Sequence, residues 1–322
     1  MIFGLLPLLV LAGVVVLVVR LASGTDESTG ESGGVAVRRI FQYLVLLATL
    51  VLSCAGLSGI LVEALTASDQ VTQDTSAIAR SIALLIVGVP AFIALALYTR
   101  RKLRENPAEV RSAGWAIYLT LVLFGSLVAT VMLLITLFGD LFVGEGPDAE
   151  VVVNAVVWGA VWGVHWWISS IPRYAPDLWF ERILGSFVGL SVTLVSGAIL
   201  AATSLVVIYN ALFDVVSVGA SAEQIVRPLV ALFVGGLAWV WYWLRIALHE
   251  ERTILWVAYV LFAGVLSGVA MVAIAGGTVV FAILEWILAD PSDAASNHFE
   301  VVPAALGVVL VGAATWVYHR SV

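Results

Sequence analysis

The sequence predicts an all-α integral membrane protein with nine transmembrane helices: one N-terminal anchor helix plus four parallel repeats of a helical hairpin. Hydrophobic residues make up 62% of the 322 residues and charged residues only 11%, against roughly 45–50% and roughly 25% in soluble chains. Nine apolar runs approach or exceed the roughly 20 residues that cross a bilayer as a helix. Basic and aromatic residues also recur along the chain at a nearly constant spacing.

Short polar segments separate the nine apolar runs, which lie at residues 2–21, 40–65, 78–98, 114–142, 151–171, 183–213, 225–248, 254–288 and 302–318. The first run has no basic residue before it and Arg20 after it, the reverse of a signal peptide. Residues 1–21 are therefore predicted to be a retained transmembrane anchor. Residues 22–37 are acidic and rich in Gly and Ser, which predicts a flexible cytoplasmic linker.

The distribution of basic residues predicts the orientation. With the N-terminus outside, 13 of the 15 Lys and Arg residues fall on the cytoplasmic side, and only Arg80 and Arg227 lie outside. An excess of Lys and Arg in cytoplasmic loops is the general rule for membrane proteins. We predict a multi-pass protein of the bacterial inner membrane with an outer N-terminus and a cytoplasmic C-terminus.

Two series of landmarks predict an internal repeat. Basic residues open alternate spans at separations of 72, 71 and 70 residues, and a glycine recurs in each following span. The two series are Arg39, Arg111, Arg182 and Arg252, and Gly88, Gly159, Gly235 and Gly312. A constant period indicates a repeat architecture. The predicted hairpins are residues 38–108, 109–178, 179–250 and 251–322. Each crosses the membrane twice, so all four share one orientation. They could surround a central path, face one another across a cleft, or form a solid bundle.

The first hairpin opens with Arg39-Ile-Phe-Gln-Tyr43-Leu and continues into a span rich in Leu, Ala and Gly. Later hairpins close with Gly-x-x-x-Trp followed by aromatics and Arg. With these motifs the chain resembles a family of uncharacterised bacterial membrane proteins, a domain of unknown function built from paired-helix units. The resemblance extends from Arg38 to the C-terminus, and it implies no activity and no catalytic residue.

Composition excludes several classes of protein. Cys54 is the single cysteine, so one chain cannot form an intramolecular disulfide, a zinc cluster or an iron–sulfur site. There is no P-loop motif, no basic stripe for nucleic acid, and no lysine in a span, since Lys102 lies in a charged segment. No cluster of Ser, His and Asp has catalytic spacing. We therefore predict a protein that is not an enzyme, with no cofactor, no metal site and no nucleic-acid partner.

One helix face in residues 151–171 is the first candidate site. Trp158, Trp162 and Trp166 recur every four residues, and His165 lies on the same face. His165 is predicted to be the only histidine within a span, where an ionisable group is a functional hypothesis by default. The alternative is a histidine satisfied by a neighbouring helix or directed to the interface.

Four more residues are candidate ligand or pathway residues. Trp239 and Trp243 form a second aromatic concentration, which could bind an apolar or cationic molecule or form an interfacial belt. Glu63 and Glu285 have apolar neighbours on both sides and are candidates for burial at bilayer depth. The run 254–288 is longer than one span, and Gly276-Gly277-Thr278 predicts a break or an extracellular projection there.

Two functions follow from these observations. The first is transport or permeation of a small solute or cation through the four hairpins, which the repeats and the acidic outer loops favour. The alternative is a non-catalytic membrane subunit or scaffold of a larger complex. A membrane-protein partner or a homo-oligomer is possible for the chain. The close-packing motifs Gly185-x-x-x-Gly189 and Gly264-x-x-x-Gly268 favour this alternative. The lipid bilayer is the partner common to both.

Overall fold

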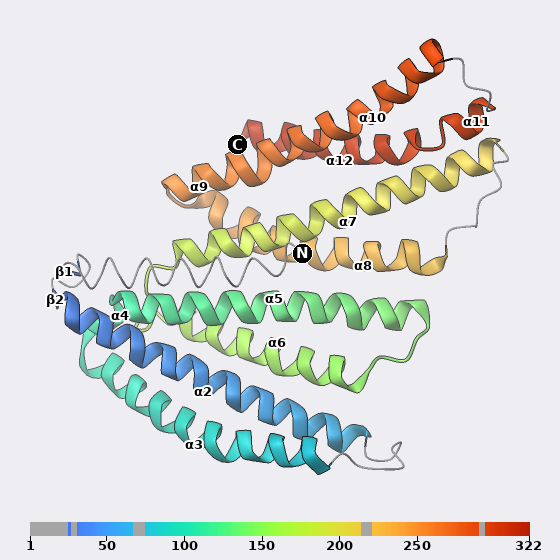
Figure 1. Cartoon of the computed structure of the whole chain (residues 1–322). Helices are drawn as coiled ribbons and strands as arrows, with labels where there is room; N and C mark the ends of the chain where they lie inside the picture. Colours follow the sequence, from blue (N-terminus) through green and yellow to red (C-terminus); the bar gives the residue numbers. More distant parts are fainter. Residues whose placement is uncertain (1–24, 27–30, 67–74, 214–220, 290–293) are drawn as a thin grey trace. The chain divides into compact units, whose positions relative to one another are not determined.

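The computed structural model describes residues 25–26, 31–66, 75–213, 221–289 and 294–322. Over these ranges the chain is helical apart from short loops and one antiparallel pair of two-residue strands, β1 (Thr25–Asp26) and β2 (Glu31–Ser32). Eight of the described helices are long and apolar enough to cross a membrane, and Figure 1 shows their order. Their length and composition make the chain a multi-pass membrane protein.

Six of these spans are continuous α-helices: α2 (Gly33–Thr66), α3 (Thr75–Glu105), α5 (Ala113–Val143), α6 (Ala149–Ser170), α7 (Trp179–Phe213) and α12 (Val302–Ser321). Two short helices, α4 (Pro107–Val110) and α11 (Ala295–His298), lie in connections. Polar side chains fix two of the helix starts. The Asn106 side chain accepts a hydrogen bond from the Ala108 N–H at 3.0 Å, and Ser112 Oγ accepts one from the Trp115 N–H at 3.3 Å.

The other two spans contain π-helical turns. In Ala222–His249, α8 (Ala222–Trp239) continues into the π-helical η1 (Val240–Ile246) and the 3-10 turn η2 (Ala247–His249). In Ile254–Ala289, α9 (Ile254–Ala258) continues into the π-helical η3 (Tyr259–Leu266) and then α10 (Ser267–Ala289).

The predicted spans and these helices agree in position for eight of the nine runs. The predicted anchor at residues 1–21 lies outside the described residues. Helix α2 begins at Gly33, inside the predicted linker 22–37. The expected break at residues 276–278 is wrong, because α10 continues through them. A broken helix in lipid would leave backbone groups without partners, so two glycines alone do not interrupt it.

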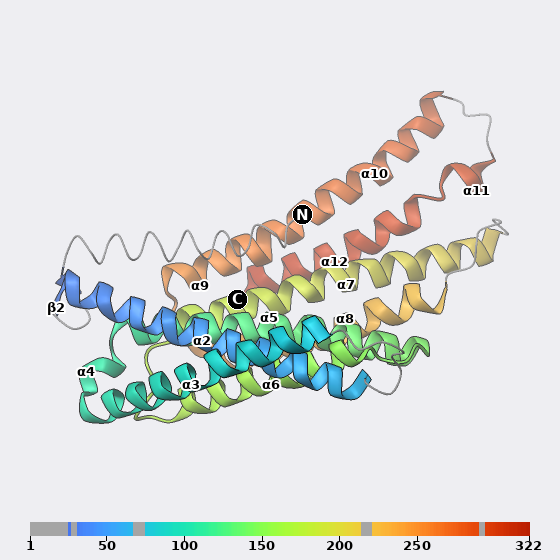
Figure 2. The same ribbon diagram turned by 60° about the horizontal axis from the view of Figure 1, so that its bottom comes forward.

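The chain divides into two compact units. The first extends to Thr130 and adds Ala149–Glu181, and the second comprises Val131–Asp148 and Arg182–Val322. In the first unit α2 packs against α3 and α6, and Figures 1 and 2 show α2 and α3 side by side along their length. In the second unit α12 packs against η3 and α10.

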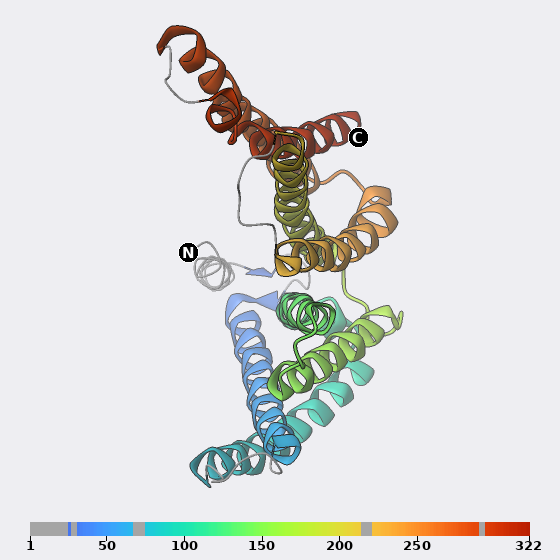
Figure 3. The same cartoon turned by 90° about the vertical axis from the view of Figure 1, so that its right-hand side faces the viewer.

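The first unit has one apolar core. Leu119 and Leu123 of α5 are fully buried in it, together with Leu46 and Leu50 of α2 and Val157 of α6. Figure 3 looks nearly along α5 and shows the other blue-to-green helices on one side of it. Outward-facing side chains of the same helices are apolar and exposed, as they are where a helix contacts lipid.

The second unit depends on close helix contacts at glycine. A Cβ on Gly185 or Gly189 of α7 would lie 2.3 Å from the Tyr242 ring or 2.4 Å from the Trp239 backbone nitrogen. A Cβ on Gly264 of η3 would lie 2.3 Å from the His319 ring. Both predicted close-packing motifs are thus used inside this unit, where small residues let the helix backbones approach.

Candidate functional site

A histidine–tyrosine pair lies in the interior of the first unit. His165 of α6 is 6% exposed, its Nε2 is 2.9 Å from the Tyr118 hydroxyl, and its Nδ1 is 2.8 Å from the Val161 carbonyl oxygen. A carbonyl oxygen only accepts hydrogen bonds, so the neutral ring carries its proton on Nδ1. Nε2 is then the acceptor, and the Tyr118 hydroxyl donates to it. The surroundings therefore select one tautomer of His165.

Two further aromatic rings connect this pair to α2. The Trp115 ring stacks on Tyr118 at 5.4 Å, and the Tyr43 ring lies 5.6 Å from Trp115 and 6.0 Å from Tyr118. Such contacts add about 0.5–1.5 kcal/mol each beyond burial of apolar area. Trp115 Nε1 donates to the Tyr174 carbonyl at 2.9 Å. The four side chains thus join α2, α5, α6 and the loop after α6.

The cluster ends at a buried carboxylate. Glu109 of α4 is 1% exposed and accepts a hydrogen bond from the Tyr43 hydroxyl at 2.9 Å. The Arg39 Nε lies 3.0 Å from its other oxygen, and the Lys102 ammonium lies 4.0 Å from that oxygen. A buried charge is tolerated only where it is paired and hydrogen-bonded. Glu109 meets this condition with side chains from both α2 and α3.

The second unit holds a similar aromatic group around His319. His319 of α12 is 2% exposed and lies within 6.2 Å, ring to ring, of Trp239, Trp243, Tyr259 and Tyr318. Trp239 Nε1 donates to the Tyr259 hydroxyl at 2.9 Å, and Trp243 Nε1 donates to the Tyr318 hydroxyl at 3.0 Å. The His319 Nδ1 lies 2.9 Å from the Thr315 carbonyl oxygen. Its Nε2 has no hydrogen-bond partner in the part of the chain that the structure describes.

The π-helical turns supply part of this second group. Trp243 belongs to η1 and Tyr259 opens η3. A π-helical turn holds one extra residue per turn and is frequent at functional sites. Both turns of this kind among the described helices lie beside His319.

Several side-chain contacts recur in the two units. The pattern Glu-x-Arg-[Ser/Thr]-x-x-Trp-x-x-Tyr occurs at residues 109–118 and 250–259, and Trp-x-x-His occurs at 162–165 and 316–319. Arg39 pairs with Glu109 in the first unit, and Arg182 pairs with Glu250 in the second. Thr253 Oγ1 accepts from the Trp256 N–H at 3.2 Å, as Ser112 does from Trp115.

The candidate residues of the first unit are mostly in its core. Trp158, Trp162 and Trp166 are half-buried and pack against the apolar core, and Trp162 and Trp166 stack at 5.8 Å. The expected common face with His165 is therefore directed into the helix bundle. Glu63 is half-buried near the other end of α2 from Arg39.

In the second unit the structure joins Trp239 and Trp243 but not Glu285. The Trp243 ring is fully buried, and both tryptophans contact His319. Glu285 is exposed on α10, so protein side chains do not bury it, and its depth in the bilayer stays a prediction.

Sequence reasoning missed His319. The expectation that His165 is the only histidine within a span is wrong, because α12 extends to Ser321 and buries His319. The recurrence of Trp-x-x-His at 162–165 and 316–319 is the signal that could have found it. Tyr118, Tyr259 and Glu109 were also missed, and the pattern shared by 109–118 and 250–259 contains all three of these positions.

Carboxylates surround Arg227 in the second unit. Asp140, Glu145 and Glu223 lie 2.7, 3.1 and 2.9 Å from its guanidinium nitrogens. Arg227, which is predicted to face outside, is thus paired with three carboxylates that are also predicted to face outside. Across the described ranges, no group of three or more His, Cys, Asp or Glu side chains could hold a metal ion.

One of three comparisons with known proteins gives a match. Residues 39–164 match the model of a family described as a domain of unknown function (DUF5671), which fits the uncharacterised family that the sequence resembles. The matched segment begins at Arg39 of the ion pair and ends one residue before His165. No curated protein and no solved structure matches the chain.

Proposed function

We propose that the chain is a membrane transport protein, built from two four-span units of equal orientation, that moves a small solute or a cation. The observation that carries this proposal is the recurrence of the same kinds of contact in both units: an Arg–Glu pair, a capped Trp and a Tyr beside a His. Four crossings return the chain to its starting side, so two successive units are parallel repeats. In transporters with repeats the substrate site lies near the bilayer midplane.

The two His–Tyr pairs support the proposal because they differ in hydrogen bonding. Tyr118 donates to His165 in the first unit, whereas the Tyr259 hydroxyl accepts from Trp239 and leaves His319 Nε2 without a described partner. One motif thus occurs in two hydrogen-bonding arrangements. A carrier needs elements with two arrangements of nearly equal free energy, and a buried histidine can favour one of them through its protonation.

We further propose that each unit consists of two of the four hairpins 38–108, 109–178, 179–250 and 251–322. The chain would lie in a bacterial inner membrane with its N-terminus outside, as the arginine distribution favours. The role proposed is not enzymatic.

Cysteine accessibility tests the proposal without knowledge of the substrate. In a Cys54→Ala background, Gly159→Cys and Ala313→Cys place one thiol six residues before His165 or His319, near the middle of α6 or α12. A Cβ at Gly159 meets nothing closer than 3.8 Å. Transport through water-filled half-channels predicts that an impermeant maleimide labels both thiols in right-side-out and in inverted vesicles.

Val164→Cys is the matched control, because Val164 is an exposed apolar residue of α6 and its thiol would face lipid and stay unlabelled. Protection of Gly159→Cys and Ala313→Cys from both sides, while an end-of-helix thiol reacts, would contradict transport by these units.

A non-catalytic membrane subunit is the second candidate, and a different observation favours it. The stripe of Trp158, Trp162 and Trp166 packs into the core of the first unit, as it does in a helix bundle without a path. A stoichiometric partner protein in native mass spectra of gently extracted membranes would support this candidate. A lone chain or a homo-oligomer would count against it.

A further inference from the structure

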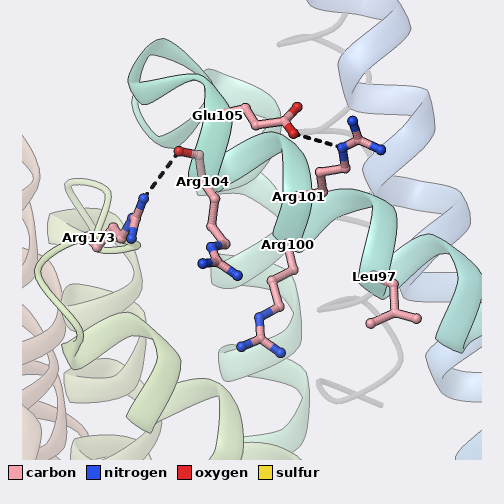
Figure 4. Close-up of a pocket in the computed structure, with 6 residues that line it drawn as sticks. All are labelled: Leu97, Arg100, Arg101, Arg104, Glu105 and Arg173. Carbon is pink, nitrogen blue, oxygen red and sulfur yellow. Dashed lines mark hydrogen bonds and ion pairs between the residues drawn. The ribbon is translucent and has the colours of Figure 1, made fainter.

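A basic pocket lies at one end of the first unit, and neither His165 nor Tyr118 lines it. The last two turns of α3 and the loop after α6 line it with Leu97, Arg100, Arg101, Arg104, Glu105 and Arg173. Figure 4 shows Arg100 and Arg104 extending from the same side of α3, with Arg173 reaching toward them from the other segment.

The charges in this pocket are unbalanced. Glu105 is its only carboxylate, and it lies 2.7 Å from Arg101 Nε. Arg100 and Arg104 have no ion-pair partner among the described side chains, and both are exposed. Lys102 is directed elsewhere, toward Gln42 and Glu109. The pocket therefore has guanidinium groups available for an anion.

Arg173 holds the two sides of the pocket together. Its Nη2 donates to the Arg104 carbonyl oxygen at 3.3 Å, across 69 residues of sequence. Carbonyl groups at a helix C-terminus carry partial negative charge, which by itself would disfavour an anion there. Arg173 offsets this charge by binding one of those carbonyls, and its planar guanidinium still presents other donors.

An apolar stripe leads from the bilayer to this pocket. Ile86, Ile93 and Leu97 lie on the α3 face that continues to Arg100 and Arg104, because successive members are three, four or seven residues apart. The three apolar side chains are 68%, 50% and 59% exposed. An acyl chain can lie along such a stripe while its headgroup reaches the guanidinium groups.

We propose that this pocket binds the phosphate headgroup of an anionic phospholipid, with an acyl chain along the exposed face of α3. Guanidinium groups bind phosphate through paired hydrogen bonds, and basic pockets between transmembrane helices commonly hold anionic headgroups. The same chemistry would bind free inorganic phosphate, but only a lipid would also use the stripe. The inference depends on the spans lying in a bilayer and not on the proposed transport.

Native mass spectrometry of the full chain in detergent, titrated with phosphatidylglycerol or with phosphatidylcholine, tests this inference. The wild-type chain should retain phosphatidylglycerol preferentially. Arg100→Gln and Arg104→Gln should each weaken its binding about fivefold, as loss of one interfacial arginine does. Arg38→Gln, which changes an exposed arginine outside the pocket, should leave binding unchanged.

Equal retention of the two lipids, or unchanged binding in the double variant Arg100→Gln/Arg104→Gln, would overturn the proposal. Displacement of the lipid by millimolar inorganic phosphate would assign the pocket to free phosphate and overturn the lipid assignment. Both arginines are exposed and lack described ion pairs, so folding should survive their replacement. Size-exclusion profiles check that the variants fold. The salt dependence of lipid binding to the wild-type chain independently checks that charge contributes to that binding.

Discussion

Glu109 is a fully buried carboxylate of the first unit. It lies in the short helix between α3 and α5, and its oxygens contact Tyr43 and Arg39. Removing such a pair from water costs free energy, so its net contribution to stability is small. Removing only one partner nevertheless destabilises the protein strongly. Its role is to hold α2 beside the α3–α5 connection in one arrangement.

Glu109→Gln should therefore destabilise the first unit strongly. The substitution removes the buried carboxylate that pairs with Arg39, and breaking a buried ion pair costs about 3–5 kcal/mol. Reversible unfolding in mixed micelles measures this. The control is Glu105→Gln, which disrupts the exposed pair with Arg101 and should cost less than about 1 kcal/mol. Equal effects of the two substitutions would show that the Glu109 pair is not buried.

Tyr118→Phe tests the hydrogen bond to His165. The aromatic packing remains, but His165 Nε2 loses its donor in a buried site, and about 1 kcal/mol of stability should be lost. The same unfolding assay measures this difference. A nitrogen-15 spectrum of the histidine should show a changed Nε2 signal at unchanged Nδ1, because the Val161 contact persists. An unchanged Nε2 signal would contradict the bond.

At the scale of the helix, small residues and π-helical turns organise the second unit. Gly185 and Gly189 bring α7 against Tyr242 and Trp239, at the junction of α8 with η1. The pairing of small residues was predictable because Gly-x-x-x-Gly is a known close-packing spacing. The π-helical turns were not predictable, because one inserted residue leaves an apolar run apolar and changes only its hydrogen bonding.

Gly189→Ala should disrupt this helix pair. Its Cβ would lie 2.4 Å from a backbone nitrogen, which cannot move away as a flexible side chain can, and overpacking of this kind costs about 1–3 kcal/mol. Thermal stability in detergent measures the loss. Gly276→Ala on α10 is the matched control, since a Cβ there meets nothing within 4 Å, and its stability should be equal to or above that of the wild-type chain. A harmless Gly189→Ala would contradict the close approach.

For the whole molecule, the sequence was sufficient for the number and position of the described spans, because bilayer thickness sets the length of an apolar run. The site was only partly predictable. Trp243 and His165 were identified by their position in spans, but their partners Tyr318 and Tyr118 are 75 and 47 residues away. Periodicity reports which residues share a face of one helix and carries no information about which helices meet.

The predicted orientation is testable with two single cysteines in the Cys54→Ala background. Gly146→Cys lies in the loop before α6 and Ala175→Cys lies in the loop after it, and both positions are exposed. An impermeant thiol reagent should label Gly146→Cys only from the outer side and Ala175→Cys only from the cytoplasmic side. The reverse result would invert the topology, and labelling of both from one side would remove α6 as a span.

The contact of the His319 ring with Gly264 affects how fast the imidazole ring can reorient. The ring occupies the volume where any other residue at 264 would place its side chain, and His319 is 2% exposed. Reorientation of the imidazole is therefore expected to need a transient separation of η3 and α12. Ring rotation would then share its rate with helix separation, in the microsecond-to-millisecond range of collective motions rather than the nanosecond range of free side chains.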